Sequence, residues 1–203
     1  MNFIKIALAA ITLAAASQSA HATVASGIHF IDLTGNEPVS TPGIFENDTN
    51  GFGWNELTNI QLGSLISAVD TNYGVTASTL IDSHLIGFDP TIKTSVTFSV
   101  TFYQPIQGVI WTTTGLNATN AALGLPTVTY NTARYLGLEP MDSFMVSGNT
   151  LSFTAYSIRP GDFMRVLTTA SSVSPVPEPS LFSMMGLGLV GVLFAVSRKR
   201  RIS

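Results

Sequence analysis

The sequence predicts an all-β fold: an antiparallel, jelly-roll-like β-sandwich domain flanked by an N-terminal signal helix and a C-terminal transmembrane helix. Three observations lead to this expectation. The middle of the chain is rich in Thr, Ser, Asn, Gly and β-branched residues, which favour strands and turns over helices. Short segments of alternating apolar and polar residues are separated there by turn residues, as in sandwich folds. Both ends instead carry uncharged apolar runs beside basic residues.

Residues 1–22 predict a signal peptide. Lys5 gives the start of the chain a positive charge, and residues 6–16 form an uncharged apolar run that is too short to span a bilayer comfortably. Ala20 and Ala22 then supply the small-x-small pattern that signal peptidase recognises. We therefore expect cleavage after Ala22 and export of the remaining chain. A buried N-terminal helix is the alternative interpretation.

Residues 23–170 are expected to form the β-sandwich domain. Its clearest strand covers residues 94–103, where apolar and hydroxyl side chains alternate with the period of a half-buried strand. Further strands are expected at residues 27–33, 80–88, 106–113, 143–147, 150–156 and 163–168. Gly148 and Asn149 predict a tight hairpin turn, because both residue types tolerate a positive φ.

Two segments of this domain are ambiguous. Residues 57–69 fit a helix nearly as well as two short strands around Gly63, and we expect the strands. Residues 117–124 are expected to hold one helical turn within a loop.

Charge and the lack of cysteine exclude several classes of function. Residues 23–175 hold four basic and eleven acidic side chains, which gives this stretch a formal charge of −7. Without a basic stripe to neutralise phosphates, the domain is not expected to bind nucleic acid. The chain has no cysteine, so it has neither a thiol nucleophile nor a cysteine-ligated metal site, and its fold depends on burial alone.

No sequence motif indicates a catalytic site. Asp82, Ser83 and His84 contain the residue types of a catalytic triad, but adjacent residues of a strand point to opposite faces, which argues against one. The chain lacks both a Gly-x-Ser-x-Gly elbow and a His-Glu-x-x-His motif. We expect a non-enzymatic protein without catalytic residues or a required cofactor, with a secreted hydrolase as the less favoured alternative. His84 is expected at the surface or in a cross-strand contact.

One loop has the oxygen ligands of a calcium site. Glu46, Asp48 and Asn50 stand two residues apart before Gly51, although the Glu that completes an EF-hand loop is missing. The same residue types build ordinary turns, so both interpretations stay open.

A carbohydrate-binding module, assisted by calcium, is the main alternative to a structural or adhesive role. Tryptophan rings that are exposed to solvent would provide a platform for sugar rings. Trp54 lies in a Gly/Asn-rich segment and is expected to be exposed, whereas Trp111 lies in an apolar strand and is expected in the core.

The C-terminal segment predicts a membrane anchor. After a Pro/Ser linker at residues 171–180, residues 181–197 carry no charge. As a helix this run measures about 25 Å, slightly less than the thickness of the hydrocarbon core of a bilayer. The long basic side chains that follow it can extend to the membrane surface and make up the difference. Residues 198–203 form a basic tail, which stays in the cytoplasm according to the positive-inside rule. Its stop-transfer residues are Arg198, Lys199, Arg200 and Arg201.

This tail resembles the PEP-CTERM sorting signal of exported proteins from Gram-negative-type bacteria. The resemblance rests on a motif, a short Gly/Leu-rich helix and a basic end, in that order; the motif residues are Val176, Pro177, Glu178, Pro179 and Ser180. It implies that exosortase, a membrane protease, cuts at or near the motif and removes the helix. It also implies a precursor tethered to the inner membrane, a final place at the cell surface or outside, and an association with exopolysaccharide and biofilm. A simple tail anchor is the alternative.

Overall fold

The computed structural model describes residues 24–41, 46–130, 132, 136–157 and 161–171. The chain divides into two compact units, residues 1–171 and residues 172–203, and all described residues belong to the first. The predicted signal peptide, sorting motif, transmembrane helix and basic tail lie outside the described residues. Within the described part of the chain, no helix is long and apolar enough to cross a membrane.

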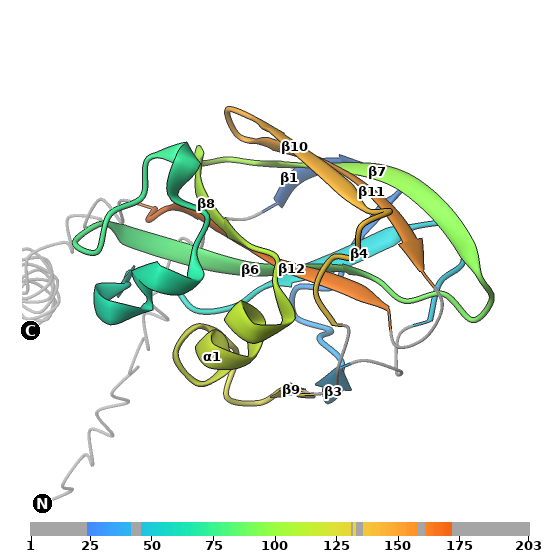
Figure 1. The fold of residues 1–203 in the computed structure, drawn as a ribbon, viewed down its shortest axis with the longest axis horizontal. Coiled ribbons are helices and arrows are strands. Elements are labelled where there is room, and N and C mark those ends of the chain that lie inside the picture. The colour runs from blue at the N-terminus through green and yellow to red at the C-terminus, as the bar shows by residue number, and fades with distance from the viewer. Residues whose placement is uncertain (1–23, 42–45, 131, 133–135, 158–160, 172–203) are drawn as a thin grey trace, which may run out of the picture. The chain divides into compact units, whose positions relative to one another are not determined.

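The domain is mostly β and is built on two main sheets (Figure 1). Sheet A is antiparallel, with the strand order β1–β7–β11–β10: β1 is Val24–Ile28, β7 is Thr94–Phe102, β11 is Thr150–Ser157 and β10 is Ser143–Ser147. Sheet B has the order β2–β4–β6–β12–β8: β2 is Phe30–Asp32, β4 is Gly51–Asn55, β6 is Leu80–Phe88, β12 is Asp162–Thr169 and β8 is Ile106–Ile110. Strand β5 (Ile60–Gln61) also pairs with β6, and in sheet B the β2–β4 pair is parallel.

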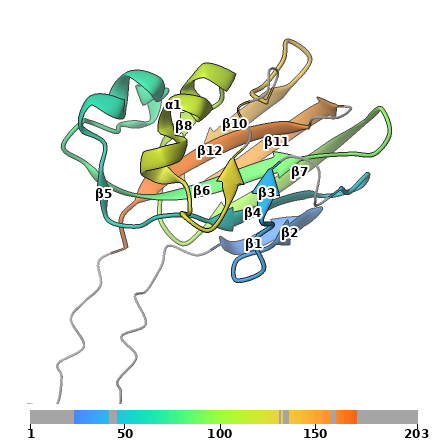
Figure 2. The same ribbon diagram turned by 90° about the horizontal axis from the view of Figure 1, so that it is seen from below.

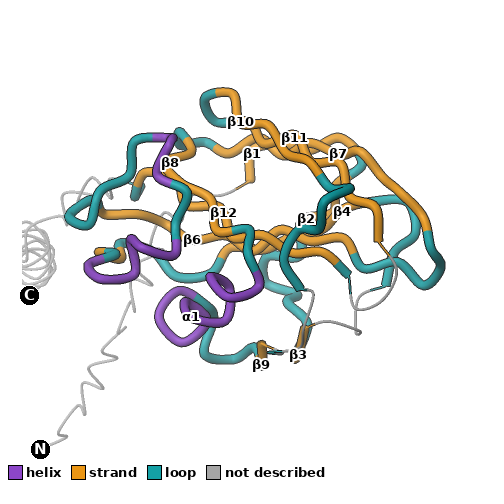
Figure 3. The backbone as a smooth tube through the Cα atoms, in the orientation of Figure 1, coloured by secondary structure: helices purple, strands orange, loops and turns teal. Residues whose placement is uncertain are grey.

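The two sheets pack face to face, and helices cover the other face of sheet B (Figure 3). These helices are the 3-10 helix η1 (Gly63–Ala68) and the α-helix α1 (Thr113–Leu123). A second 3-10 helix, η2 (Thr71–Tyr73), follows η1. The short parallel pair of β3 (Ser40–Thr41) and β9 (Thr129–Tyr130) lies beside α1 (Figure 2).

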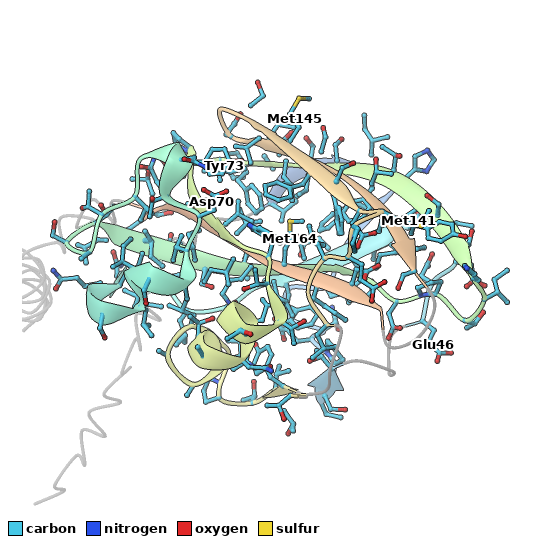
Figure 4. All side chains as sticks on the ribbon, viewed as in Figure 1. Glu46, Asp70, Tyr73, Met141, Met145 and Met164 are labelled. Carbon is cyan, nitrogen blue, oxygen red and sulfur yellow. The ribbon has the colours of Figure 1, made fainter. Side chains whose placement is uncertain are left out.

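Strand alternation in sheet B builds one hydrophobic core on each of its faces. On β12, Met164 and Val166 point toward sheet A, where they pack in the cluster that contains Phe98 and Phe153. Phe163, which directly precedes Met164, points to the opposite face of the sheet and packs in the other cluster, which contains the apolar residues of α1. Figure 4 shows the sulfur of Met164 between the sheets. The two-residue period of the strands therefore places side chains of β12 in two separate cores.

The expectation of an all-β fold with antiparallel sheets is confirmed for the described domain. Strands at residues 80–88 and 143–147 have the predicted bounds, and those at 94–103, 150–156 and 163–168 agree within one residue. These strands show clear alternation or a recognisable turn beside them. The jelly-roll description stays a prediction.

The single strand expected at residues 27–33 is wrong. His29 has a φ of 51°, and the chain turns there from β1 in sheet A to β2 in sheet B. A positive φ is uncommon for a residue other than glycine, so the sequence carried no clear signal of this corner.

The helical layer on sheet B was largely missed. Residues 57–69 form β5 and then the helix η1, in place of two strands. The strand expected at 106–113 ends at Ile110, because Thr112 caps the helix α1 by accepting a hydrogen bond from the Gly115 N–H at 3.0 Å. The helical turn expected at 117–124 is the second half of this helix.

Candidate functional site

A buried ion pair joins sheet B to α1. The Arg165 guanidinium donates to both carboxylate oxygens of Glu56, at 2.6 Å and 2.9 Å. It also donates to the Thr119 hydroxyl at 2.7 Å and to the Asn120 side-chain oxygen at 3.1 Å, both on α1. The Ser83 hydroxyl donates to Glu56 at 2.8 Å. Polar groups of four separate segments are thus satisfied at one point inside the domain.

The environment of this pair favours the charged form of Arg165. Burial lowers the pKa of Arg165, but the combined effects of the adjacent Glu56 carboxylate and of Tyr130 outweigh burial and leave that pKa above its ordinary value. The ring of Tyr130 lies 5.6 Å from the guanidinium carbon, and burial beside Glu56 raises the pKa of its phenol. Both charged side chains are fully buried, and the contacts described for them hold α1 on the sheet. The geometry is that of a structural bridge.

His84 is buried in the core between the two sheets. Of the two positions expected for it, the surface position is therefore wrong. Its Nδ1 is 2.7 Å from the side-chain oxygen of Asn55 on β4, and its Nε2 is 3.0 Å from the hydroxyl of Thr168 on β12. These are cross-strand contacts, as the second alternative expected. The Phe102 ring packs at 4.6 Å. Burial lowers the pKa of His84 to about 3, against a smaller opposing effect of Asp82, so the imidazole is neutral at pH 7.

The neighbours of His84 do not form a triad with it. Ser83 points to the α1 side of sheet B, where it bonds Glu56, while His84 points toward sheet A. Asp82 accepts from the backbone N–H groups of Asn59 at 2.9 Å and Ser171 at 3.0 Å, so its carboxylate holds the residue before β5 and the segment after β12 against β6. The alternation argument against a triad at these residues is confirmed.

The predicted calcium loop has the hydrogen bonds of a turn. Asn47 accepts from the backbone N–H groups of Thr49 at 2.9 Å and Asn50 at 2.7 Å. Asp48 accepts from the Thr91 N–H at 2.7 Å and from its hydroxyl at 2.8 Å. The side-chain bond from Thr91 is the main reason that the pKa of Asp48 is lowered.

These bonds fix Asp48 without an ion, and calcium binding by Glu46, Asp48 and Asn50 stays a prediction. Among the residues that the structure describes, no three His, Asp or Glu side chains are grouped so that they could share a metal ion. Such a grouping counts side chains only, whereas calcium also takes backbone and amide oxygens.

A buried carboxyl group lies near other acids at the start of β12. Burial, together with the smaller effects of the charges of Asp142, Glu139 and Asp89, raises the pKa of Asp162 to about 7, against a hydrogen bond from Ser157 that lowers it. Asp162 is 3% exposed. Its carboxyl group therefore holds a proton through much of the acidic range.

The expected positions of the two tryptophans are wrong. Trp54 is fully buried in β4, stacked on Phe52, whereas 39% of the Trp111 surface is exposed. Gly51 and Gly53 precede Trp54 in this strand, and a Cβ would meet the Phe98 ring at 2.4 Å at the first position and the Leu85 carbonyl oxygen at 2.5 Å at the second. The glycines thus mark a tightly packed strand where a loop was expected.

Trp111 lies at an open groove of about 400 Å³. One wall comes from η1 and the residues after it, and the other from the residues around the start of α1. The groove is lined by Ser67, Ala68, Val69, Asp70, Trp111, Thr112, Thr114, Gly115 and Ala118. Recognition of Thr112 as a helix cap would have placed Trp111 at the end of its strand, outside the core.

The outer face of sheet A is rich in hydroxyl groups. Pairing of β7 with β11 sets Thr97 opposite Thr154 and Thr101 opposite Thr150, and the hydroxyl oxygens of each pair are 2.9 Å apart. No charged residue occurs in the four strands of this sheet. Figure 4 shows Met145 of β10 pointing away from the sheet. The domain thus presents a neutral face although its residues carry a strong net negative charge.

Comparison with known proteins identifies the C-terminal segment. Residues 175–201 match the model of the PEP-CTERM protein-sorting motif, which confirms the resemblance seen in the sequence. No curated protein and no solved structure matches the chain. The motif indicates an exported protein that is a target of exosortase, with a membrane-anchored precursor.

Proposed function

We propose that this exosortase target is a non-enzymatic protein of the extracellular exopolysaccharide or biofilm matrix, with a structural or adhesive role. The observation that carries the proposal is the sorting motif at residues 175–201, which follows a compact β domain. Removal of the predicted transmembrane helix would leave that domain outside the cell as the functional part.

Features of the domain support a scaffold role. The residue types most often used in catalysis are engaged in structural bonds at Ser83, His84 and Asp82, which link strands and loops. The neutral, hydroxyl-rich face of sheet A suits contact with hydrated, uncharged polymers, because it can both donate and accept hydrogen bonds. Neither feature requires a cofactor.

Cell fractionation tests this proposal. The protein is followed by immunoblot in a host that makes its exopolysaccharide and in a mutant host that does not. We expect the processed protein in the matrix fraction of the first and in the free medium of the second. Equal amounts in the medium of both hosts would contradict a matrix role. Quantitative retention of the uncut chain in the inner membrane would contradict processing.

A further inference from the structure

We propose that the groove between η1 and α1 binds a neutral polysaccharide through stacking of a pyranose ring on the indole of Trp111. The inference rests on the proposed matrix role and names the site and the ligand class for it. The ligand is a polymer whose sugars carry equatorial hydroxyls, because such rings present an apolar C–H face that an indole can cover.

The exposure of Trp111 is the first step. An indole is a large apolar surface, and the other tryptophan of the chain is fully buried. Trp111 keeps 39% of its surface in contact with solvent at a concave site. Covering this surface with the apolar face of a sugar would remove it from water, which is favourable because apolar surface is poorly solvated.

The polar groups around the indole fit a hydroxyl-rich ligand. Thr112 and Thr114 on one wall and Ser67 on the other supply hydroxyl groups. The Thr112 hydroxyl already accepts from the Gly115 N–H and can still donate, and the Ser67 hydroxyl donates to the Ser64 carbonyl at 3.3 Å and can still accept. Asp70 also belongs to the lining, near Tyr73 (Figure 4). A few polar groups around an apolar platform are typical of sites that orient a small ligand unit.

The walls of the groove are held in place by the fold. The Asp70 N–H donates to the Val109 carbonyl at 2.8 Å, and the Trp111 carbonyl accepts from the Leu138 N–H at 2.9 Å. The absence of a side chain at Gly115 lets α1 pack closely against the end of β8, because a Cβ there would lie 2.9 Å from the side chains of Ile110 and Thr112. A site formed before binding loses less conformational entropy when the ligand arrives.

Charge selects a neutral ligand over an anionic one. The lining contains an acidic residue, Asp70, and no basic one. Residues 23–175 carry a formal charge of −7, which repels polyanions such as uronic-acid polymers at low salt.

Tryptophan fluorescence tests the site directly. Purified full-length protein in detergent is titrated with cellohexaose, a neutral glucose oligomer, while quenching by acrylamide is measured. Because Trp54 is fully buried, the quenchable emission comes from Trp111, and we expect the oligosaccharide to reduce its quenching. Alginate, an anionic polymer, should give no protection. Protection by alginate alone, or protection that appears with rising protein concentration and no sugar, would overturn the proposal.

Retention on the host's extracted exopolysaccharide separates the two proposals. We expect Trp111→Ala to lose at least tenfold in affinity, and Tyr103→Ala, which removes another exposed aromatic ring (67% exposed), to bind as wild type does. Unchanged emission of Trp54 and an unchanged melting temperature establish that the variant is folded. If wild type and Trp111→Ala are retained equally, the groove is not the site although the matrix role stands. If wild type is not retained, the matrix role itself fails.

Discussion

Ionisable side chains lie buried on both faces of sheet B, and the kind of hydrogen-bond partner differs between the two faces. On the α1 side, Arg165 and Glu56 are both charged and bond each other. On the sheet A side, His84 is neutral and bonds two uncharged groups. Burial penalises a lone charge far more than a satisfied pair or a neutral group, so the two faces respond differently to substitution and to pH.

Loss of one partner of the ion pair should be costly. In Arg165→Met the Glu56 carboxylate stays buried without its cation, and we expect a loss of about 3–5 kcal/mol in the free energy of unfolding. The double variant Glu56→Gln with Arg165→Met removes the unpaired charge and keeps an acceptor for Ser83, so it should recover part of the loss. Urea denaturation at pH 7 measures both. Equal destabilisation in the single and double variants would show that packing, and not charge, is what Arg165 contributes.

His84 and Asp162 should give the domain opposite pH dependences. The pKa of His84 is about 3 when folded and 6.5 ordinarily, so the unfolded chain alone takes up this proton as pH falls, and stability falls with it. The pKa of Asp162 is about 7 when folded and 3.8 ordinarily, so the unfolded chain alone releases this proton as pH rises, and stability falls in that direction.

Variants at the two positions separate these effects between pH 5 and pH 6.5. In Asp162→Asn the His84 effect remains, and the free energy of unfolding should rise with pH more steeply than in wild type. In His84→Gln the Asp162 effect remains, and it should rise less steeply or fall. Urea denaturation at several pH values gives the slopes. Parallel slopes in all three proteins would show that neither group titrates as its burial requires.

Single-residue environments were the least predictable level of the structure. The sequence placed Trp54 outside and Trp111 inside, and the structure has the reverse. A Gly-rich segment is typical of a loop, but at Gly51 and Gly53 the missing side chains make room for neighbours that are distant in sequence. That requirement comes from tertiary packing, which local residue patterns do not contain.

At the scale of elements, strands with a local signal were predictable and the helices were not. Strand β7 alternates strictly, and the β10–β11 hairpin has its own turn residues. Helix α1 is composed largely of Thr, Asn and Gly, which are poor helix formers. It forms because Thr112 caps it and because Leu116 and Leu123 are buried against sheet B. Packing thus outweighs propensity in this element.

The turn of the β10–β11 hairpin should depend on its glycine. Gly148 has a φ of 62°, a backbone conformation that residues with a Cβ adopt at a cost in free energy. We expect Gly148→Ala to reduce the free energy of unfolding by about 1 kcal/mol, and Gly148→Asn to cost less because Asn tolerates this conformation. Ser147→Ala, one residue earlier on an exposed strand position, is the control and should be near neutral. Thermal or urea unfolding measures the series, and equal losses for Ala and Asn would contradict the conformational explanation.

The loop of Asp48 should stabilise the domain through Thr91. Asp48→Ala removes the acceptor for the Thr91 N–H and hydroxyl, so its melting temperature should be lower than that of wild type with or without a chelator. Calcium binding at Glu46, Asp48 and Asn50 adds a separate expectation, namely that chelator lowers the melting temperature of wild type and not of the variant. Unchanged melting of wild type in chelator would reject the calcium site and keep the turn.

For the whole molecule, sequence and structure inform different parts of the chain. The sorting segment is short, linear and read by a processing enzyme, so its order of residues is sufficient to identify it. The surfaces of the domain are assembled from distant segments; the groove at Trp111, for example, combines η1 with the start of α1. Such a site becomes visible only after the sheets and helices are in place.

The sorting motif should require its central acid for processing. Proline lacks the N–H of a helix interior and clashes with the preceding turn, so Pro177 and Pro179 predict an extended segment just before the membrane helix. An extended peptide is accessible to a protease, and the basic end that follows the helix fixes the direction in which the motif is presented. Glu178 is the charged side chain between the two prolines, and we infer that it is recognised directly.

We therefore expect Glu178→Ala to block removal of the tail while the domain stays folded and tethered to the membrane. Immunoblots of membrane and medium fractions, in cells with and without exosortase, measure this. Wild type should lose its Arg-rich tail only where exosortase is present, and Arg200→Lys, which keeps the basic charge, should be processed like wild type. A variant released as readily as wild type, or a wild type that keeps its tail in exosortase-positive cells, would show that the segment acts only as an anchor. Because the domain and the tail are separate compact units, this outcome should not change the unfolding of the domain.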